Sequence, residues 1–436
     1  MSRNIISIVS LGCSKNLVDS ERLARRFADA GFDVRFDDEN PPRGTVMVFN
    51  TCGFIGDAKE ESVNALLAAI EKKKKGRVKA VYAMGCLTER YRKELPELMP
   101  ELDGIYGKFD WGAIIDAVGA LPATEKDWAR KLSSSPHSAY LKISEGCNRF
   151  CAYCAIPLIT GRHHSRPAAE IIEEVRSLAS TGTKEFNIIA QDLSSYGRDL
   201  PGAPAEPLAE LLEELAKIDG VEMLRLHYAY PSDFPYGILP VMASNPKVCK
   251  YLDIALQHID DGVLTAMRRH ITAAETEELL DRIRREVPGI HLRTTMMVGF
   301  PGETDEAFER LLEFVKRQRF ERLGAFAYCE EEGTYAAEHL PDAIPEEIKQ
   351  KRLDRLMALQ ENIAAEIAES KIGSVMRVII DSYDSGRDVY EGRTEFDSPE
   401  VDPCVYVKSD RPLKPGDICN VEITGSEFCD IEGRAL

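Results

Sequence analysis

The chain has 436 residues, which is long enough for two or three domains. Its 55 Lys and Arg against 73 Asp and Glu give a formal net charge of −18, which argues against a surface that coats nucleic acid and suits a basic partner. With 44% hydrophobic and 29% charged residues, the composition is typical of a globular protein and excludes a disordered or fibrous one.

No apolar run approaches the roughly 20 residues that span a bilayer, so we expect no membrane association. The apolar stretch at the N-terminus is too short for a secretory signal, and no small-residue cleavage site follows it. We therefore expect a cytoplasmic protein. In that reducing compartment, an odd number of cysteines, 11, indicates thiols available for a metal or cluster rather than a disulfide framework.

Residues 1–120 alternate short apolar runs with polar-faced helical segments, a pattern typical of an open α/β sheet domain. The four lysines at 72–75 could form a nucleic-acid patch, but the helix dipole favours a solvated last turn. Proline, serine and mixed charge at 121–138 predict a linker. Within residues 1–120 we expect parallel strands at 6–13, 46–52 and 78–86. We also expect helices at 20–30 and 59–75, and Gly76 is expected to end the helix at 59–75.

Residues 139–369 form a second β/α series, which predicts a partial (β/α)6 barrel that resembles a TIM barrel. A long amphipathic helix is expected at 345–372. Short alternating strands at 370–436 predict a small antiparallel β-barrel, so the chain as a whole belongs to the α/β class. The strands expected in the second series are 139–144, 185–191, 223–229, 251–257, 291–299 and 323–329.

The strongest chemical signal is a CxxxCxxC motif formed by Cys147, Cys151 and Cys154, directly after the first strand of the second series. Three thiolates within eight residues can hold one compact cluster, and a four-iron cubane would then keep one iron open to a non-protein ligand. Two alternatives remain at this point. A zinc site could recruit His163 or His164 as a fourth donor, and Cys151 with Cys154 could form a redox dithiol.

A second trio consists of Cys13, Cys52 and Cys86, each of which ends one predicted strand of the N-terminal domain beside a glycine. Parallel strands end at the same edge of a sheet, so the three thiols are expected to converge. The alternative is that they are small buried residues at strand ends, but three in the same context favour a shared site. We interpret the other five cysteines as ordinary core or surface thiols: Cys249, Cys329, Cys404, Cys419 and Cys429.

The CxxxCxxC motif at the start of a six-strand β/α series resembles the radical S-adenosylmethionine (SAM) superfamily. The segments LGCSKNLVDSE, NTCGFI and MGCLTERY ahead of SEGCNRFCAYC are similar to the methylthiotransferase family of that superfamily, over essentially the whole chain. The last segment is similar to the family's TRAM β-barrel.

This resemblance implies two 4Fe–4S clusters. Cys147, Cys151 and Cys154 would hold the cluster that binds SAM and, with an electron from a reducing donor, cleaves it to a 5′-deoxyadenosyl radical. Cys13, Cys52 and Cys86 would hold an auxiliary cluster whose open iron carries the sulfur.

The implied reaction adds a methylthio group to an unactivated C–H carbon, with one SAM supplying the methyl group and another the radical. Acid–base catalysis cannot open such a bond, so a cofactor radical is required. Strand-end position and family likeness suggest four cofactor-binding residues: Gln191, Arg293, Gly299 and Glu303. Arg225 and His227 either line the cavity or satisfy buried carbonyls, and the sequence does not choose between these roles.

The family modifies either an adenosine in tRNA or the β-carbon of an aspartate in protein twelve of the small ribosomal subunit. Residues 370–436 hold eight Lys and Arg against fourteen Asp and Glu, a net charge of −6. That charge suits a basic ribosomal protein, so no stable nucleic-acid binding is expected.

The amino-acid sequences at 152–166 and 392–402 also resemble those of the ribosomal-protein branch of the family. We therefore favour the aspartate-modifying enzyme, with the tRNA-modifying enzyme as the alternative. From a different class, a non-catalytic metal-stabilised binding protein is also considered.

Overall fold

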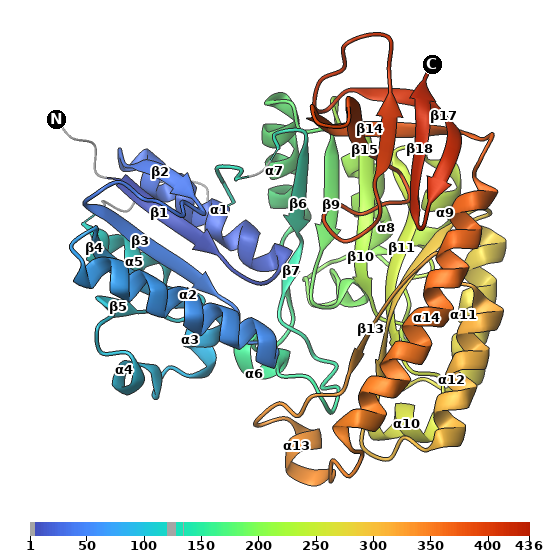
Figure 1. Ribbon diagram of the computed structural model, residues 1–436, viewed down its shortest axis with the longest axis horizontal. Helices are drawn as coiled ribbons and strands as arrows, with labels where there is room; N and C mark the ends of the chain where they lie inside the picture. Colours follow the sequence, from blue (N-terminus) through green and yellow to red (C-terminus); the bar gives the residue numbers. More distant parts are fainter. Residues whose placement is uncertain (1–4, 120–127, 134) are drawn as a thin grey trace.

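The computed structural model describes residues 5–119, 128–133 and 135–436. The chain folds into three domains that follow one another in sequence: an N-terminal domain, a core and a C-terminal barrel (Figure 1). The N-terminal domain is a five-stranded parallel sheet in the order β2-β1-β3-β4-β5. Apolar residues pack both faces, one against α1 and α5 and the other against α2, α3 and α4. The elements are β1 (Ile5–Ser10), α1 (Ser14–Asp29), β2 (Asp33–Phe36), β3 (Thr45–Thr51), α2 (Gly56–Lys74), β4 (Val78–Gly85), α3 (Cys86–Arg90), α4 (Leu95–Leu98), β5 (Gly104–Ile105) and α5 (Trp111–Val118).

The three strands and two helices predicted for this domain are confirmed. Helix α1 begins at Ser14 instead of Ser20, because a polar first turn hides its apolar period in the sequence. Strands β2 and β5 were not predicted, since four and two residues are too few to show an alternation.

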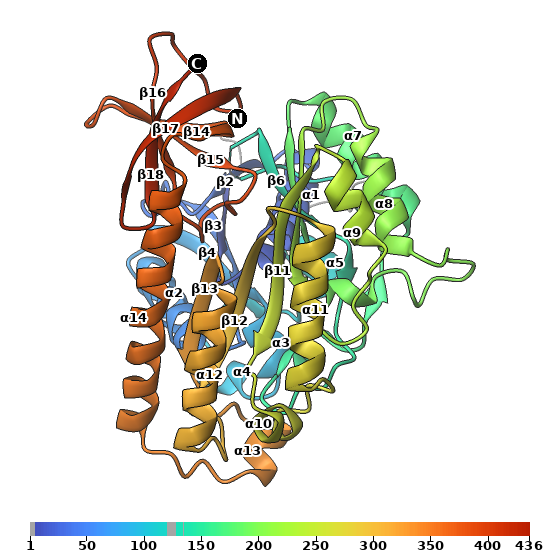
Figure 2. The ribbon, with the colours of Figure 1, turned by 90° about the vertical axis from the view of Figure 1, so that its right-hand side faces the viewer.

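The core is a six-stranded parallel sheet in the order β13-β12-β11-β10-β9-β6, open between its edge strands, so the predicted partial barrel is confirmed. Helices α7, α8, α9, α11 and α12 lie on the outer face, and the inner face turns toward the N-terminal domain (Figures 1 and 2). The strands are β6 (Ser138–Lys142), β7 (Ser144–Glu145), β8 (His164–Ser165), β9 (Glu185–Ile189), β10 (Met223–Ala229), β11 (Val248–Gln257), β12 (His291–Val298) and β13 (Arg322–Ala327). The helices are α6 (Ile156–Thr160), α7 (Ala168–Ser180), η1 (Leu193–Ser195), α8 (Pro207–Ala216), α9 (Ile238–Ser244), α10 (Asp261–Ala266), α11 (Ala273–Glu286), α12 (Asp305–Gln318) and α13 (Tyr335–His339).

The long helix α14 (Glu346–Ser370) leads into a closed barrel in the order β14-β15-β16-β18-β17. Four of its five strand pairs are antiparallel, as predicted, and β16 pairs with β18 in parallel. Its strands are β14 (Val375–Asp384), β15 (Val389–Thr394), β16 (Val405–Lys408), β17 (Ile418–Glu427) and β18 (Asp430–Ala435).

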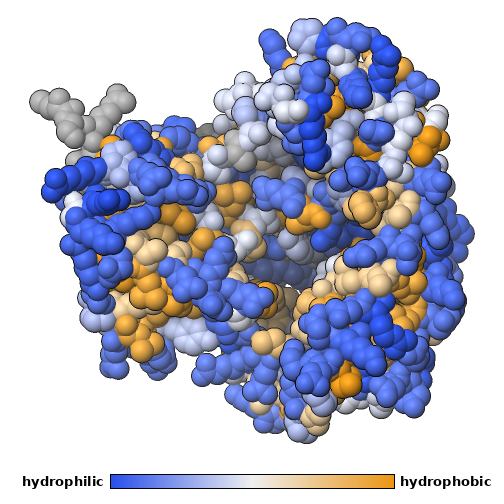
Figure 3. Space-filling view, in the orientation of Figure 1, coloured by the Kyte–Doolittle hydropathy of each residue, from blue (hydrophilic) through white to orange (hydrophobic). Residues whose placement is uncertain are grey.

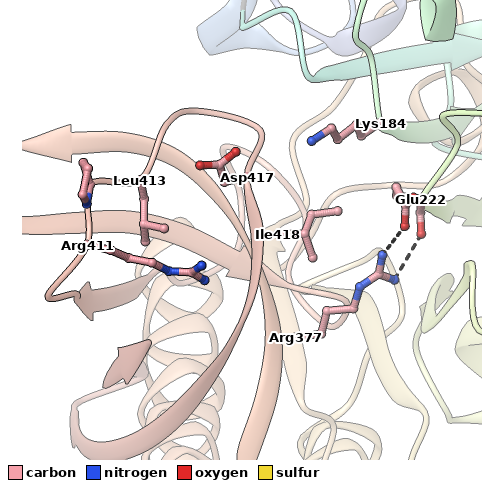
Figure 4. A pocket seen from close by; sticks show the side chains of 8 residues that line it. Lys184, Glu222, Arg377, Arg411, Leu413, Asp417 and Ile418 are labelled. Carbon is pink, nitrogen blue, oxygen red and sulfur yellow. Dashed lines mark hydrogen bonds and ion pairs between the residues drawn. The ribbon is translucent and has the colours of Figure 1, made fainter. Parts of the chain in front are cut away.

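Ion pairs attach this barrel to the amino ends of the core strands, and those of Glu185 are buried. Glu185, at the start of β9, accepts from Arg225 and Arg393 at 2.7 Å each. Burial alone would raise the pKa of Glu185, but the two guanidinium groups hold it well below its usual range. Figure 4 shows a second bridge, where Arg377 of β14 pairs with Glu222 at 2.5 Å beside a cavity of about 540 Å³. The C-terminal barrel thus covers the amino ends of the core strands. The carboxyl ends of the core strands are left free to form a site.

The predicted linker at 121–138 falls partly outside the described residues, because 120–127 and 134 are not among them. The described part is packed between two domains. Arg130 is buried, with Nη1 3.2 Å from Glu21 of α1 and Nε 2.9 Å from Glu174 of α7. Over the described residues, no helix combines the length and the apolar character needed to cross a membrane.

Candidate active site

Strands β1, β3 and β4 are neighbours and parallel, so the cysteines that follow them meet at one edge of the sheet. Cys13 caps α1, Cys52 follows β3 directly, and Cys86 opens α3. The flanking glycines allow this approach: a Cβ at Gly12 would lie 2.7 Å from the Cys52 sulfur, and one at Gly53 would lie 2.7 Å from a backbone nitrogen of α3.

The N-terminal trio is electrostatically coupled. The pKa of Cys86 is raised to about 12, mainly by burial; Lys108 lowers it, and the neighbouring thiols of Cys13 and Cys52 raise it. The Cys86 thiol donates to Asn16 Oδ1 at 3.5 Å. A buried thiol with a pKa raised this far, as at Cys86, stays protonated at neutral pH until a metal centre displaces the proton.

The CxxxCxxC trio lies in the loop after β7. The backbone turns sharply there, with Phe150 at φ 49° and Gly146 at φ 78°. Burial raises the pKa of Cys147 to about 12. The backbone N–H of Arg149 donates to the Cys147 sulfur at 3.4 Å, and Arg269 donates to the Cys151 sulfur at 3.5 Å. Hydrogen bonds of this kind stabilise thiolates that ligate a cluster.

Both trios line one cavity of about 330 Å³ between the N-terminal domain and the core, on the side where the space-filling view is hollowed (Figure 3). Among the described residues that line it, none is an Asp or Glu. A cationic, thiol-lined chamber fits two iron–sulfur clusters with thiolate ligands and the carboxylate of SAM. The lining includes four cations, Lys15, Lys108, Arg149 and Arg269, and the polar or aromatic residues Gln191, Tyr153, Tyr228, Tyr230 and Gln257.

The zinc alternative finds no support in the two histidines. His163 Nε2 lies 3.0 Å from Ser165 Oγ, His164 is exposed, and neither lines the cavity. Over the residues that the structure describes, no three His, Cys, Asp or Glu side chains are grouped closely enough to surround a single metal ion.

The structure brings one of the four predicted cofactor-binding residues to the cysteines. Gln191 lines the cavity and donates to Glu145. Arg293 lies near the start of β12, where it pairs with Asp402 at 2.6 Å. Glu303 is buried and accepts from the N–H of Gly299 at 2.5 Å and from Arg352 at 2.7 Å, so it supports a turn outside the cavity. These three residues do not line the chamber.

The two residues whose role the sequence left open have separate positions. Arg225 serves the seam with the C-terminal barrel through Glu185. His227 is buried on β10, with Nδ1 4.0 Å from Asp253, and burial lowers its pKa well below the usual value.

Several residues of the chamber were not predicted. Tyr228 and Gln257, at the ends of β10 and β11, adopt φ values of 64° and 73°, a conformation that non-glycine residues hold only where the surroundings impose it. Arg149 stacks over the Tyr230 ring at 4.3 Å and pairs with Asp192 at 2.6 Å. The strand-end rule that suggested Gln191 could also have identified Tyr228 and Gln257.

Three family comparisons divide the chain in the same order as the fold. Residues 5–107 match the uncharacterized protein family UPF0004, residues 141–315 match the radical SAM superfamily, and residues 372–436 match the TRAM domain. Among solved structures, the radical SAM methyltransferase TsrM from Kitasatospora setae superposes with a TM-score of 0.54 at 16% identity, covering 75% of this chain and 72% of that one. This likeness concerns the fold.

Full-length relatives are much closer in sequence. The ribosomal protein uS12 methylthiotransferase RimO of Porphyromonas gingivalis is 56% identical over 438 residues and that of Phocaeicola vulgatus is 55% identical over 437, each with both chains fully covered. The protein of the same name from Flavobacterium johnsoniae is 44% identical, covering all of this chain and 98% of that one. The chain therefore belongs to the RimO family of ribosomal protein uS12 methylthiotransferases, within the radical SAM superfamily.

Proposed function

We propose that the chain transfers a methylthio group to the β-carbon of an aspartate in ribosomal protein uS12, as a radical SAM enzyme. The observation that carries this proposal is the shared chamber: two cysteine trios, more than 60 residues apart in sequence, line one cavity. Transfer of sulfur from the auxiliary cluster to a substrate carbon opened by the SAM-derived radical would require this arrangement, because that carbon must reach both clusters.

In this proposal each trio holds one 4Fe–4S cluster. Cys147, Cys151 and Cys154 hold the SAM-binding cluster, and Cys13, Cys52 and Cys86 hold the auxiliary cluster. When bound, the two clusters and SAM would supply the radical that opens an unactivated C–H bond and the sulfur and methyl group that replace the hydrogen.

The protein's own residues prepare the chamber for that chemistry. Arg269 and Arg149 place positive charge beside the CxxxCxxC trio, and Lys108 places it beside the N-terminal trio, where these cations favour the thiolate forms of the neighbouring cysteines. Apolar and aromatic side chains, among them Phe54, Tyr153 and Ile156, restrict water at the lining.

The substrate assignment is supported by the names of the relatives and by charge. Ribosomal proteins are typically basic, and the C-terminal barrel carries a net charge of −6, which suits such a partner and disfavours a stable grip on tRNA. The proposal also requires a reducing electron donor supplied from outside the chain.

The test is an anaerobic incubation of the reconstituted, reduced protein with SAM and either purified uS12 or tRNA, followed by mass spectrometry. A methylthio mass increment on an aspartate of uS12 is expected. An increment on tRNA alone would replace this substrate by the adenosine alternative. A colourless, zinc-containing protein without either product would instead support a non-catalytic binding protein.

A further inference from the structure

Lys15 is the exception among the cations of the chamber. Lys108 is buried and lies 2.9 Å from Asp19 Oδ2, and Arg149 pairs with Asp192 at 2.6 Å. Arg269 donates to the carbonyl of Ala255 and to the Cys151 sulfur. Each of these cations therefore has a partner within the protein.

Lys15 has no such partner. Among the described residues, no carboxylate lies within 4.0 Å of its ammonium group, which is also true of Arg269, but the Lys15 ammonium group makes no hydrogen bond either and lies 3.0 Å from the centre of the Tyr228 ring. A cation–π contact of this kind contributes only about 0.5–2 kcal/mol and leaves the N–H donors available. The ammonium group is thus held in place at the chamber without a direct ion pair, although it acts at longer range on the buried carboxyl of Asp253.

The local structure makes a cation at this position unfavourable unless it has a ligand. Lys15 lies in the first turn of α1, a turn that contains no acidic residue. A positive side chain beside a helix N-terminus costs about 0.3–1 kcal/mol, because the helix dipole is positive there. A residue whose charge opposes the local helix dipole in this way is expected mainly at functional positions.

The position of Lys15 suits a group that must lie between the two trios. Its backbone follows Cys13 by two residues, and its side chain reaches across the domain boundary to Tyr228 at the end of β10. Tyr228 itself adopts φ 64°, a backbone conformation that non-glycine residues hold only where the surroundings impose it.

We infer that Lys15 binds the carboxylate of the substrate aspartate and thereby positions its β-carbon in the chamber. The inference rests on the proposed function. In aspartate the carboxylate carbon is bonded directly to the β-carbon. A contact between the ammonium group and the carboxylate therefore holds the reacting carbon one bond away from the bound group. Lys15 is the substrate-binding cation in this scheme, and the other three support the cysteines.

The experiment measures binding of two short uS12 peptides to the anaerobic, reconstituted enzyme by fluorescence anisotropy. One peptide carries the target aspartate, identified from the product of the wild-type reaction, and the other carries asparagine in its place. A charge-assisted hydrogen bond predicts that wild-type enzyme binds the aspartate peptide about 10- to 100-fold more tightly. Lys15→Met should reduce this preference to within about 2-fold, and Lys15→Arg should retain most of it.

Two further variants guard against structural effects. Lys15→Gln provides a second neutral side chain in case Lys15→Met fails to fold. Lys79→Met removes an exposed ammonium group from the amino end of β4, at the opposite edge of the same sheet, and should keep the wild-type preference. Iron content is measured for every variant.

The outcomes separate this inference from the function on which it rests. If the neutral variants lose iron but keep the wild-type preference, Lys15 serves the auxiliary cluster and the inference fails while the function stands. If wild-type enzyme modifies the aspartate peptide but binds both peptides equally, the inference again fails alone. If wild-type enzyme neither prefers nor modifies the aspartate peptide, both are overturned.

Discussion

Arg90 and Glu331 join the N-terminal domain to the core, with Arg90 Nη1 2.8 Å from Glu331 Oε2 and both side chains almost fully buried. Lys59 approaches the same carboxylate oxygen at 2.8 Å. Arg90 also donates to the carbonyl of Gly53 at 2.9 Å, directly after Cys52. One carboxylate of the core thus holds two cations beside the strand ends that carry the N-terminal cysteines.

We expect Glu331→Gln to destabilise the contact between the two domains by about 3–5 kcal/mol, because it leaves Arg90 buried without its counter-charge. Denaturant unfolding of the reconstituted protein, followed through the iron–sulfur absorbance, measures the effect. Glu366→Gln is the matched control: it breaks the exposed Arg319–Glu366 pair and should cost no more than about 1 kcal/mol. Equal losses in both variants would contradict a role for the buried bridge.

Changing Cys13, Cys52 and Cys86 together to Ala should lower the iron content from about eight to about four atoms per chain, because one cubane loses its ligands. The same change at Cys147, Cys151 and Cys154 should remove the other four. Methylthiolation should be lost in both cases. Iron analysis and mass spectrometry of uS12 check this, with Cys429→Ser, outside the chamber, as the control that retains iron. Removal of all iron by either triple change would show that the two sites depend on each other.

Asp253 should make stability depend on pH in an identifiable way. Burial raises its pKa from 3.8 to about 6, although Arg293 lowers it. The folded state therefore holds this proton more tightly than the unfolded state. The contribution of Asp253 to the free energy of unfolding is fully present below pH 4, and about 3 kcal/mol of it is lost as the pH rises through 6. Asp253→Asn should remove this loss. The difference in unfolding free energy between variant and wild type, measured from pH 4 to pH 8, should grow in favour of the variant.

Asp397 should show the opposite dependence. Burial would raise its pKa, but Arg322, at 2.6 Å, and Lys371 lower it from 3.8 to about 2. Its stabilisation is therefore present above pH 4 and is lost as the pH falls toward 2, by about 2 kcal/mol. Asp397→Asn should be less stable than wild type at pH 6 and equal to it near pH 2. A difference in unfolding free energy between variant and wild type that stays constant from pH 6 to pH 2 would show that packing, and not charge, stabilises the contact between Asp397 and Arg322.

Local patterns in the sequence predicted much of the architecture. The six core strands were visible because buried parallel strands are continuous apolar runs, and the cysteine motifs were visible because their spacing is short or repeats the same context. The bounds of strands β15 and β18 cannot be predicted from the sequence, because their polar residues mask the alternation. Arg293 was suggested from its strand, but it lies near the amino end, away from the cysteines.

By itself the sequence predicted which residues would bear the chemistry, six cysteines in two trios, and a parallel topology that must bring three of them to one edge. Only the tertiary structure decided that both trios open into one chamber and that Lys15 has no carboxylate beside it among the described residues. The physical reason is that periodicity and spacing are properties of neighbouring residues. A chamber between domains and a charge without a partner depend on which distant side chains meet, as Arg90 and Glu331 do across 241 positions.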